Sequence, residues 1–170
     1  MPLDELSGPN LAGVVADANA VGLPYVVIGG FSVIAHGYLR ATKDSDLLVS
    51  DGPDADKTIL RFLDRIEAKR LRDGKILTAD EVIDTHHLRV NSRHGIVDIL
   101  RGGLPPLDYE TVAERAVELD AGGEPAPFAS LRTLVGFKRL AGRGQDRLDL
   151  ENLERVNGKL PEDEIPGLDV

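Results

Sequence analysis

Two segments that lie close together in the sequence decide the fold: Val27-Ile28-Gly29-Gly30-Phe31-Ser32 and Lys43-Asp44-Ser45-Asp46-Leu47-Leu48-Val49. An apolar run ends at a glycine pair, and two aspartates open the next apolar run. Residues two apart on a strand point to the same face, so both carboxylates would stand on one face, with their Cα atoms about 6.6 Å apart. We expect them to hold a divalent metal ion. The glycine pair exposes backbone N–H groups at the start of a helix, where phosphate binds readily.

Composition limits the class of protein. A chain of 170 residues with 42% hydrophobic content can bury a sizeable core, and we expect a single domain over residues 1–160. The absence of cysteine excludes disulfides and thiolate metal sites. A net charge of -9 disfavours non-specific attraction to nucleic acid or anionic lipid.

Neither a leader nor a membrane span is predicted. The start, Met1-Pro2-Leu3-Asp4-Glu5, has no basic region and no apolar core of signal-peptide length. No apolar run approaches the roughly 20 residues needed to cross a bilayer. We therefore expect a cytoplasmic protein without a membrane partner.

Apolar periodicity and turn residues predict an α+β fold, in which a mixed β-sheet is faced by helices and the last helices come at the C-terminal end. The acidic tail over 161–170 is expected to be frayed. The expected helices cover 11–21, 31–36, 54–68, 108–115, 131–141 and 145–155, and the expected strands cover 25–28, 46–49, 88–90, 96–100, 116–119 and 126–129.

A third acid strengthens the metal prediction. Asp98 lies inside the apolar run 96–100, where a lone charge is costly to bury unless it is paired or bound to metal. Each feature alone has an ordinary explanation: a solvated turn for Asp44 and Asp46, a tight turn for the glycines, a hydrogen-bonded carboxylate for Asp98. Together they predict a three-carboxylate site, which needs a counter-ion because like charges destabilise one another. Mg²⁺ suits such a site, and Mn²⁺ is the alternative.

The joint pattern resembles the nucleotidyltransferase superfamily, whose core is like that of DNA polymerase β. The matching motifs are Ile28-Gly29-Gly30, Asp44-Ser45-Asp46 and Val97-Asp98-Ile99. Segments 36–44 and 138–150 resemble, more narrowly, the small stand-alone bacterial branch related to abortive-infection toxins and minimal nucleotidyltransferases. The resemblance covers roughly residues 25–155. One departure is Ser45, since family members usually carry an aliphatic residue between the two aspartates.

The resemblance implies transfer of a nucleoside monophosphate from a nucleoside triphosphate to an acceptor, with release of pyrophosphate. Asp44 and Asp46 would hold the metals. Asp98 would complete the acceptor-side metal and help to activate the nucleophile. The triphosphate would meet a set of small residues in the glycine turn, namely Gly29, Gly30 and Ser32.

Basic residues supply candidate phosphate contacts in an otherwise acidic chain. Arg40 lies four residues before Asp44, close enough to reach a phosphate. By the family resemblance, Lys138 and Arg143 would contact the triphosphate as well. We expect Arg132 and Arg147 on a solvated helix face. Two late acids are expected to orient the bases rather than to bind metal, namely Asp146 and Asp149.

The acceptor is not written in the sequence. It could be a protein side chain, a tRNA end or a small molecule such as an aminoglycoside, and ATP is among the candidate nucleotides. The rival class is a non-catalytic antitoxin-like or binding module that retains the fold, with a cognate partner protein in a toxin–antitoxin pair. The intact acid triad argues against this rival. A metal-dependent phosphohydrolase is disfavoured by the glycine turn before the acids.

Overall fold

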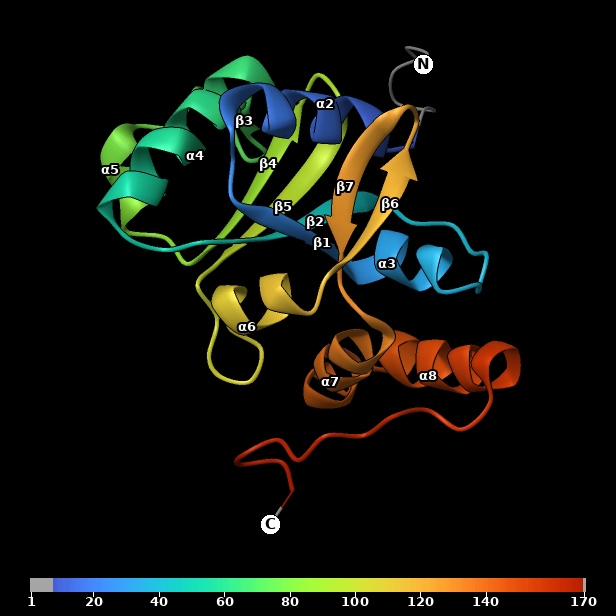
Figure 1. The fold of residues 1–170 in the computed structure, drawn as a ribbon. Coiled ribbons are helices and arrows are strands. Elements are labelled where there is room, and N and C mark those ends of the chain that lie inside the picture. Colours follow the sequence, from blue (N-terminus) through green and yellow to red (C-terminus); the bar gives the residue numbers. More distant parts are fainter. Residues whose placement is uncertain (1–7, 170) are drawn as a thin grey trace.

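The computed structural model describes residues 8–169, and the N-terminal segment used to argue against a leader lies outside them. Figure 1 shows one twisted sheet with helices on both of its faces. No helix in the described part of the chain is long and apolar enough to cross a membrane.

The seven strands form a single mixed sheet in the order β3-β4-β5-β2-β1-β7-β6. Strand pairs β2–β5 and β1–β7 are parallel, and the other neighbours are antiparallel. This confirms the α+β fold with a mixed sheet. The strands are β1 (Tyr25–Ile28), β2 (Asp44–Val49), β3 (Lys69–Arg70), β4 (His87–Ser92), β5 (Gly95–Arg101), β6 (Val117–Ala121) and β7 (Glu124–Phe128).

The predicted helices are all present, with ends that shift by a few residues. Ser130 caps α7, as its sequence position predicts: its side chain accepts a hydrogen bond from the N–H of Thr133. The helices are α2 (Leu11–Val21), α3 (Gly29–Ala35), α4 (Pro53–Arg65), α5 (Ala79–Ile83), α6 (Tyr109–Glu114), α7 (Leu131–Ala141) and α8 (Gly144–Asn157).

Two short elements were not predicted from the sequence. Strand β3 has two residues, and only its pairing with β4 defines it. Helix α5 begins at a capping box in which Thr78 and Glu81 bond each other's backbone N–H groups. That Thr-x-x-Glu spacing is a recognised start signal for a helix. The sequence therefore held a signal for α5 but none for β3.

The two faces of the sheet have different roles. On one face, alternating residues of β1, β2 and β5 pack against α2 and α4; they include Val27, Leu47 and Ile99. On the other face, a smaller apolar cluster joins Val26 and Leu48 to α6. Figure 1 shows α2 and α4 on one side of the sheet and α6 and α7 on the other. The second face is only partly covered, which leaves the ends of β1, β2 and β5 open.

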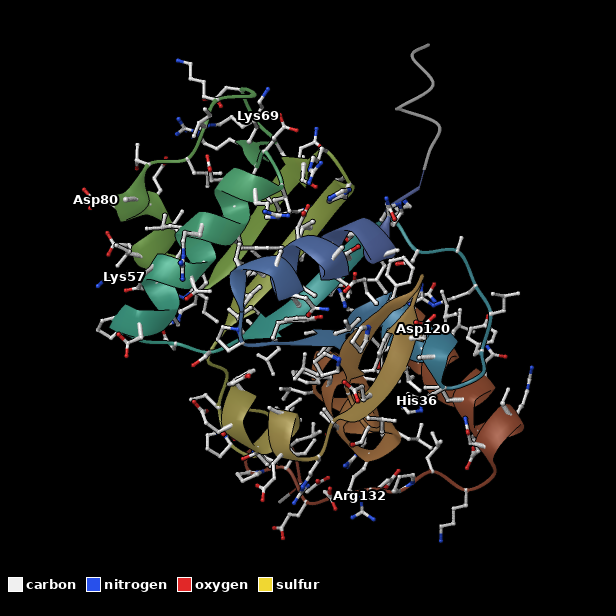
Figure 2. All side chains as sticks on the ribbon, turned by 45° about the horizontal axis from the view of Figure 1, so that its top comes forward. His36, Lys57, Lys69, Asp80, Asp120 and Arg132 are labelled. Atoms are coloured by element: carbon white, nitrogen blue, oxygen red, sulfur yellow. The ribbon has the colours of Figure 1, made fainter. Side chains whose placement is uncertain are left out.

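The C-terminal tail contacts α7 in the structure, and the expectation that it frays stays a prediction. Ile165 is only 4% exposed. Arg139 of α7 pairs with Asp169 at 2.6 Å, and Arg132 pairs with Asp163. Arg132 projects from the outer edge of the molecule (Figure 2). The acidic tail is held because α7 presents arginines to it. The domain boundary at residue 160 stays a prediction.

Candidate active site at the ends of strands β1, β2 and β5

One row of residues crosses four neighbouring strands. Ile28 of β1 lies opposite Asp46 of β2, Asp46 lies opposite Asp98 of β5, and Asp98 lies opposite Arg89 of β4. Side chains of paired residues stand on the same face of a sheet. Asp44 stands two residues before Asp46 and shares that face. The strand register, rather than nearness in sequence, brings the third acid to the other two.

The three acids form a compact group, called the acid cluster below. Carboxylate oxygens of Asp44, Asp46 and Asp98 all lie within 4.8 Å of one another. Burial raises the pKa of Asp46 to about 8, and the charges of the other two acids add to the effect. Burial also raises the pKa of Asp98, although the Arg89 guanidinium opposes the shift. The cluster is short of positive charge, and an all-oxygen donor set of this kind suits a hard divalent cation.

Two residues beside the acids were not recognised from the sequence. Arg89 Nη1 donates to Asp44 Oδ2 at 3.0 Å and to Asp98 Oδ2 at 2.6 Å. His87 Nε2 lies 3.3 Å from Asp98 Oδ1. Neither Arg89 nor His87 is among the candidate residues that the sequence indicates. Alternation along β4 places both side chains on one face, but only the pairing with β5 shows that this is the face of the acids.

The glycine turn lies directly against the acid cluster. Gly29 has a φ of +70°, and a Cβ there would stand 2.1 Å from Asp46 Oδ2. A Cβ on Gly30 would stand 2.5 Å from the Thr42 hydroxyl oxygen. Neither position has room for a side chain, so the backbone at the start of α3 comes within van der Waals distance of the acids.

A second charged group faces the acid cluster, called the ion-pair network below: Arg40, Lys138, Arg143, Asp146 and Asp149. Arg40 binds Asp149 through two hydrogen bonds of 2.8 and 2.9 Å. Lys138 Nζ lies 3.1 Å from an Asp146 oxygen and 2.9 Å from an Asp149 oxygen. Arg143 Nε donates to Asp146 at 2.8 Å. The two aspartates orient the bases.

The carboxyls of this network have the opposite electrostatic environment. Burial acts to raise the pKa of Asp146 and of Asp149, but hydrogen bonds from the surrounding cations outweigh it and hold both pKa values below the ordinary range. Lys138 is 7% exposed, whereas the Arg143 side chain is 76% exposed. Of the three cations, Arg143 has the most exposed side chain.

A cavity of about 670 Å³ separates the acid cluster from the ion-pair network. Eight of the nine residues that the sequence analysis selected line it: Gly29, Gly30, Arg40, Asp44, Asp46, Asp98, Lys138 and Arg143. The ninth, Ser32, does not. It is 0% exposed, and its hydroxyl has no hydrogen-bond partner among the described residues.

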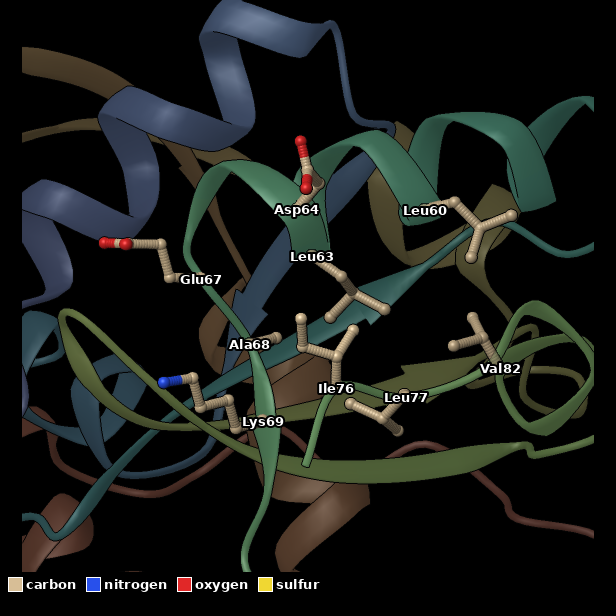
Figure 3. Close-up of a pocket in the computed structure, with 9 residues that line it drawn as sticks. All are labelled: Leu60, Leu63, Asp64, Glu67, Ala68, Lys69, Ile76, Leu77 and Val82. Atoms are coloured by element: carbon tan, nitrogen blue, oxygen red, sulfur yellow. The ribbon is translucent and has the colours of Figure 1, made fainter. Parts of the chain in front are cut away.

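The acids also border a second, smaller cavity of about 220 Å³. It shares Ile28, Asp46, His87 and Asp98 with the larger one, and adds Leu47 and Leu100. Asp46 and Asp98 therefore border both the larger cavity and a small cavity with apolar side chains in its lining. A third cavity, of about 340 Å³, lies between α4, β3 and α5, and none of the three acids lines it (Figure 3).

No protein-family model matches the chain, and no curated protein matches it in sequence. Solved structures do match. The lincomycin-bound lincosamide antibiotic adenylyltransferase LnuA superposes with a TM-score of 0.58 at 16% identity, over 87% of this chain and 96% of that chain. The antibiotic-resistance factor ANT(2'')-Ia gives 0.58 at 12%, over 87% and 82%. The chain has the nucleotidyltransferase fold.

A third nucleotidyltransferase-fold neighbour is an antigenic nucleotidyltransferase-like protein from Paracoccidioides brasiliensis. Its TM-score is 0.56 at 13% identity, over 84% of this chain and 71% of that one. Identities this low show the fold alone. The narrower resemblance to the abortive-infection branch stays a prediction, since none of these three neighbours is described as such a toxin.

Proposed function

We propose that this chain is a metal-dependent nucleotidyltransferase, with ATP as a candidate substrate. The acceptor oxygen forms a bond to the α-phosphorus of the nucleotide, the bond to the bridging oxygen breaks, and pyrophosphate leaves. The acceptor's proton passes to Asp98, the acid that borders both cavities from β5. One observation carries the proposal. The three carboxylates of the acid cluster lack neutralising positive charge, and across a single cavity they face the ion-pair network, which has more cations than acids.

The acid cluster would hold Mg²⁺ or Mn²⁺. Its oxygens come from two adjacent strands in fixed register, lie within 4.8 Å of one another, and include Asp46, for which no protein cation is within bonding distance among the described residues. When bound, a divalent ion would neutralise charge that develops on the phosphates. The protein residues do the rest by binding and orienting both substrates.

The nucleotide would occupy the larger cavity. Gly29 and Gly30 line that cavity beside the acids, and their missing side chains leave room for Asp46 and Thr42 to pack against the turn. Arg40 and Lys138 are committed to Asp149 and act as a fixed positive potential. Arg143 is exposed and would contact phosphate directly. Ser32 is not assigned a contact, because its hydroxyl is fully buried.

The acceptor would enter from the smaller cavity, which Asp46 and Asp98 also border. Its lining adds only apolar residues, Leu47 and Leu100, to the shared ones. A cavity of about 220 Å³ accepts a hydroxyl-bearing part of a small molecule more readily than a tRNA end, whose phosphates the net charge of -9 repels. LnuA and ANT(2'')-Ia, by their descriptions, act on antibiotics, which favours a small-molecule acceptor here.

Labelled nucleotide tests the proposal. The purified protein is incubated with each α-labelled nucleoside triphosphate, Mg²⁺, and separately a small-molecule extract, total protein or total tRNA. We expect Mg²⁺-dependent label in the small-molecule fraction, and none with Asp46→Asn. Label in protein or tRNA would correct the acceptor. No transfer to any fraction, with no rise in melting temperature on adding Mg²⁺ and nucleotide, would refute the proposed function.

A non-catalytic antitoxin-like or binding module is the second candidate, and one observation favours it. Arg89 already neutralises part of the acid cluster without a metal. In such a module the ligand would be a cognate partner protein, and Asp46→Asn would leave its binding unchanged. The two candidates therefore differ in whether the acids are needed.

A further inference from the structure

We propose that Arg89 is a built-in counter-ion that a divalent metal must displace from the acid cluster. The guanidinium neutralises Asp44 and Asp98 while the metal is absent and swings away when the metal binds. This inference rests on the proposed function in one respect, since it takes the acid cluster to be the metal site.

The contacts of Arg89 place it on the ligand atoms themselves. A single nitrogen, Nη1, lies 3.0 Å from Asp44 Oδ2 and 2.6 Å from Asp98 Oδ2. It therefore bridges two of the three carboxylates that a metal would need. An oxygen lone pair that accepts a charged N–H at these distances is not available to a cation in the same direction. A metal ion that used these two oxygens would therefore displace the Arg89 bridge.

The bridge can open because little else holds the side chain. The Arg89 side chain is 44% exposed, and among the described residues its hydrogen bonds and ion pairs go only to the two acids. Arg101 provides the contrast on the neighbouring strand. It is 4% exposed and bonds Asp56 together with two backbone carbonyls. Arg101 is a fixed structural cation, whereas Arg89 can rotate into solvent.

Displacement would also give Arg89 a second use. The residue lines the larger cavity from β4, so the released guanidinium stays beside the bound nucleotide. An arginine fork binds phosphate through paired hydrogen bonds. Metal entry would thus free a phosphate-binding cation at the moment when the triphosphate needs one.

Manganese binding to the nucleotide-free protein tests the exchange. The dissociation constant for Mn²⁺ is measured by electron paramagnetic resonance for wild type, Arg89→Gln and Arg89→Met. Lys43→Gln is the matched control: Lys43 lines the same cavity and makes no ion pair with any described residue. We expect both Arg89 variants to bind Mn²⁺ about tenfold or more tightly than wild type, and Lys43→Gln to change it less than about threefold.

A second readout uses stability. Without metal, each Arg89 variant should melt below wild type, because the acids lose their counter-ion, and Mn²⁺ should raise its melting temperature more than it raises that of wild type. Unchanged Mn²⁺ affinity in both Arg89 variants overturns the exchange alone. Equal tightening in Lys43→Gln also overturns it, since general charge would then explain the effect. Folded protein that binds no Mn²⁺ in any form overturns the metal site of the proposed function as well.

Discussion

The acid cluster and the ion-pair network face each other across one cavity and are built from the same residue types in different proportion. The acid cluster has three carboxylates and one bridging arginine, and the pKa of Asp46 rises to about 8. The ion-pair network has two carboxylates and three cations, and the pKa values of both carboxyls fall. Burial acts to raise the carboxyl pKa values in both groups, so the number of neighbouring cations decides whether each pKa finally rises or falls.

This difference in neutralising charge indicates which of the two groups a bound cation would stabilise. A carboxylate already satisfied by cations has no free energy left to gain from a metal, whereas a crowded, under-neutralised one does. The acid cluster is therefore the part of the molecule that a cation should stabilise. The network holds α7, α8 and the loop before β2 together, and its surplus positive charge remains directed at the cavity.

The largest expected effect is on transfer in Asp46→Asn. Loss of a ligand should remove several kcal/mol of transition-state stabilisation, which is a loss of about 100-fold or more. The metal-free variant should be as stable as wild type or more so, because the folded chain no longer has to hold a proton on Asp46 or bear a third negative charge there. Initial rates with labelled nucleotide and melting curves in a chelator measure the two effects. A clear loss of metal-free stability would mean that Asp46 has a structural role, and the contrast between the acid cluster and the ion-pair network would then fail.

The next largest effect is expected for Lys138→Ala, whose loss of folding stability tests the structural role of the ion-pair network. Removing one partner of a buried pair costs about 3–5 kcal/mol, and Arg40 and Arg143 still neutralise the two aspartates, so we expect about 3 kcal/mol. Urea unfolding measures this loss of unfolding free energy. Arg132→Ala, which breaks an exposed pair on the same helix, is the control and should cost less than about 1 kcal/mol. A stable Lys138→Ala with about tenfold weaker nucleotide binding would instead assign Lys138 to the ligand.

The two regions should also respond oppositely to pH. The folded pKa of Asp46, about 8, exceeds its ordinary 3.8, so the folded state holds a proton that the unfolded chain has lost. Metal-free wild type should lose stability relative to Asp46→Asn as pH rises from about 5 to 8, by at least about 2 °C in melting temperature. The contribution of Asp149 to the stability of the folded state is fully present above pH 3.8 and is lost as the pH falls below that value, because its folded pKa is lowered. A constant difference between the two proteins over this range would show that Asp46 is not perturbed.

The smallest effect concerns the opposite face of β2. Ser45 is 0% exposed, and its hydroxyl has no partner among the described residues. An unsatisfied buried hydroxyl costs about 1–3 kcal/mol, so Ser45→Ala should gain up to about 1 kcal/mol after the packing loss. Ser92→Ala is the control and should lose about 1 kcal/mol, because its hydroxyl donates to the Gly95 carbonyl at 2.7 Å. A destabilised Ser45→Ala would mean that the hydroxyl is satisfied.

Much of the fold could be predicted because its signals are local. Strand β1 was predicted with its observed bounds, and Ser130 marks the start of α7, since apolar runs and caps act over a few residues. The two-residue β3 could not be predicted, because only its pairing partner makes it a strand. The ion pairs between the tail and α7 could not be predicted for a similar reason: its acidic residues look solvated until the arginines of α7 are placed beside them.

For the candidate site, the sequence by itself determined the local geometry of the paired aspartates and of the glycine turn. A period of two puts Asp44 and Asp46 on one face of a strand, and Gly29 meets a positive φ that other residues resist. The tertiary structure alone decided their neighbours. Register between β2, β5 and β4 sets Asp98 and then Arg89 beside Asp46, and packing of α7 on α8 gives Lys138 its two aspartates. Spacing along one element is fixed by backbone geometry, whereas contacts between distant elements follow from how the whole core packs.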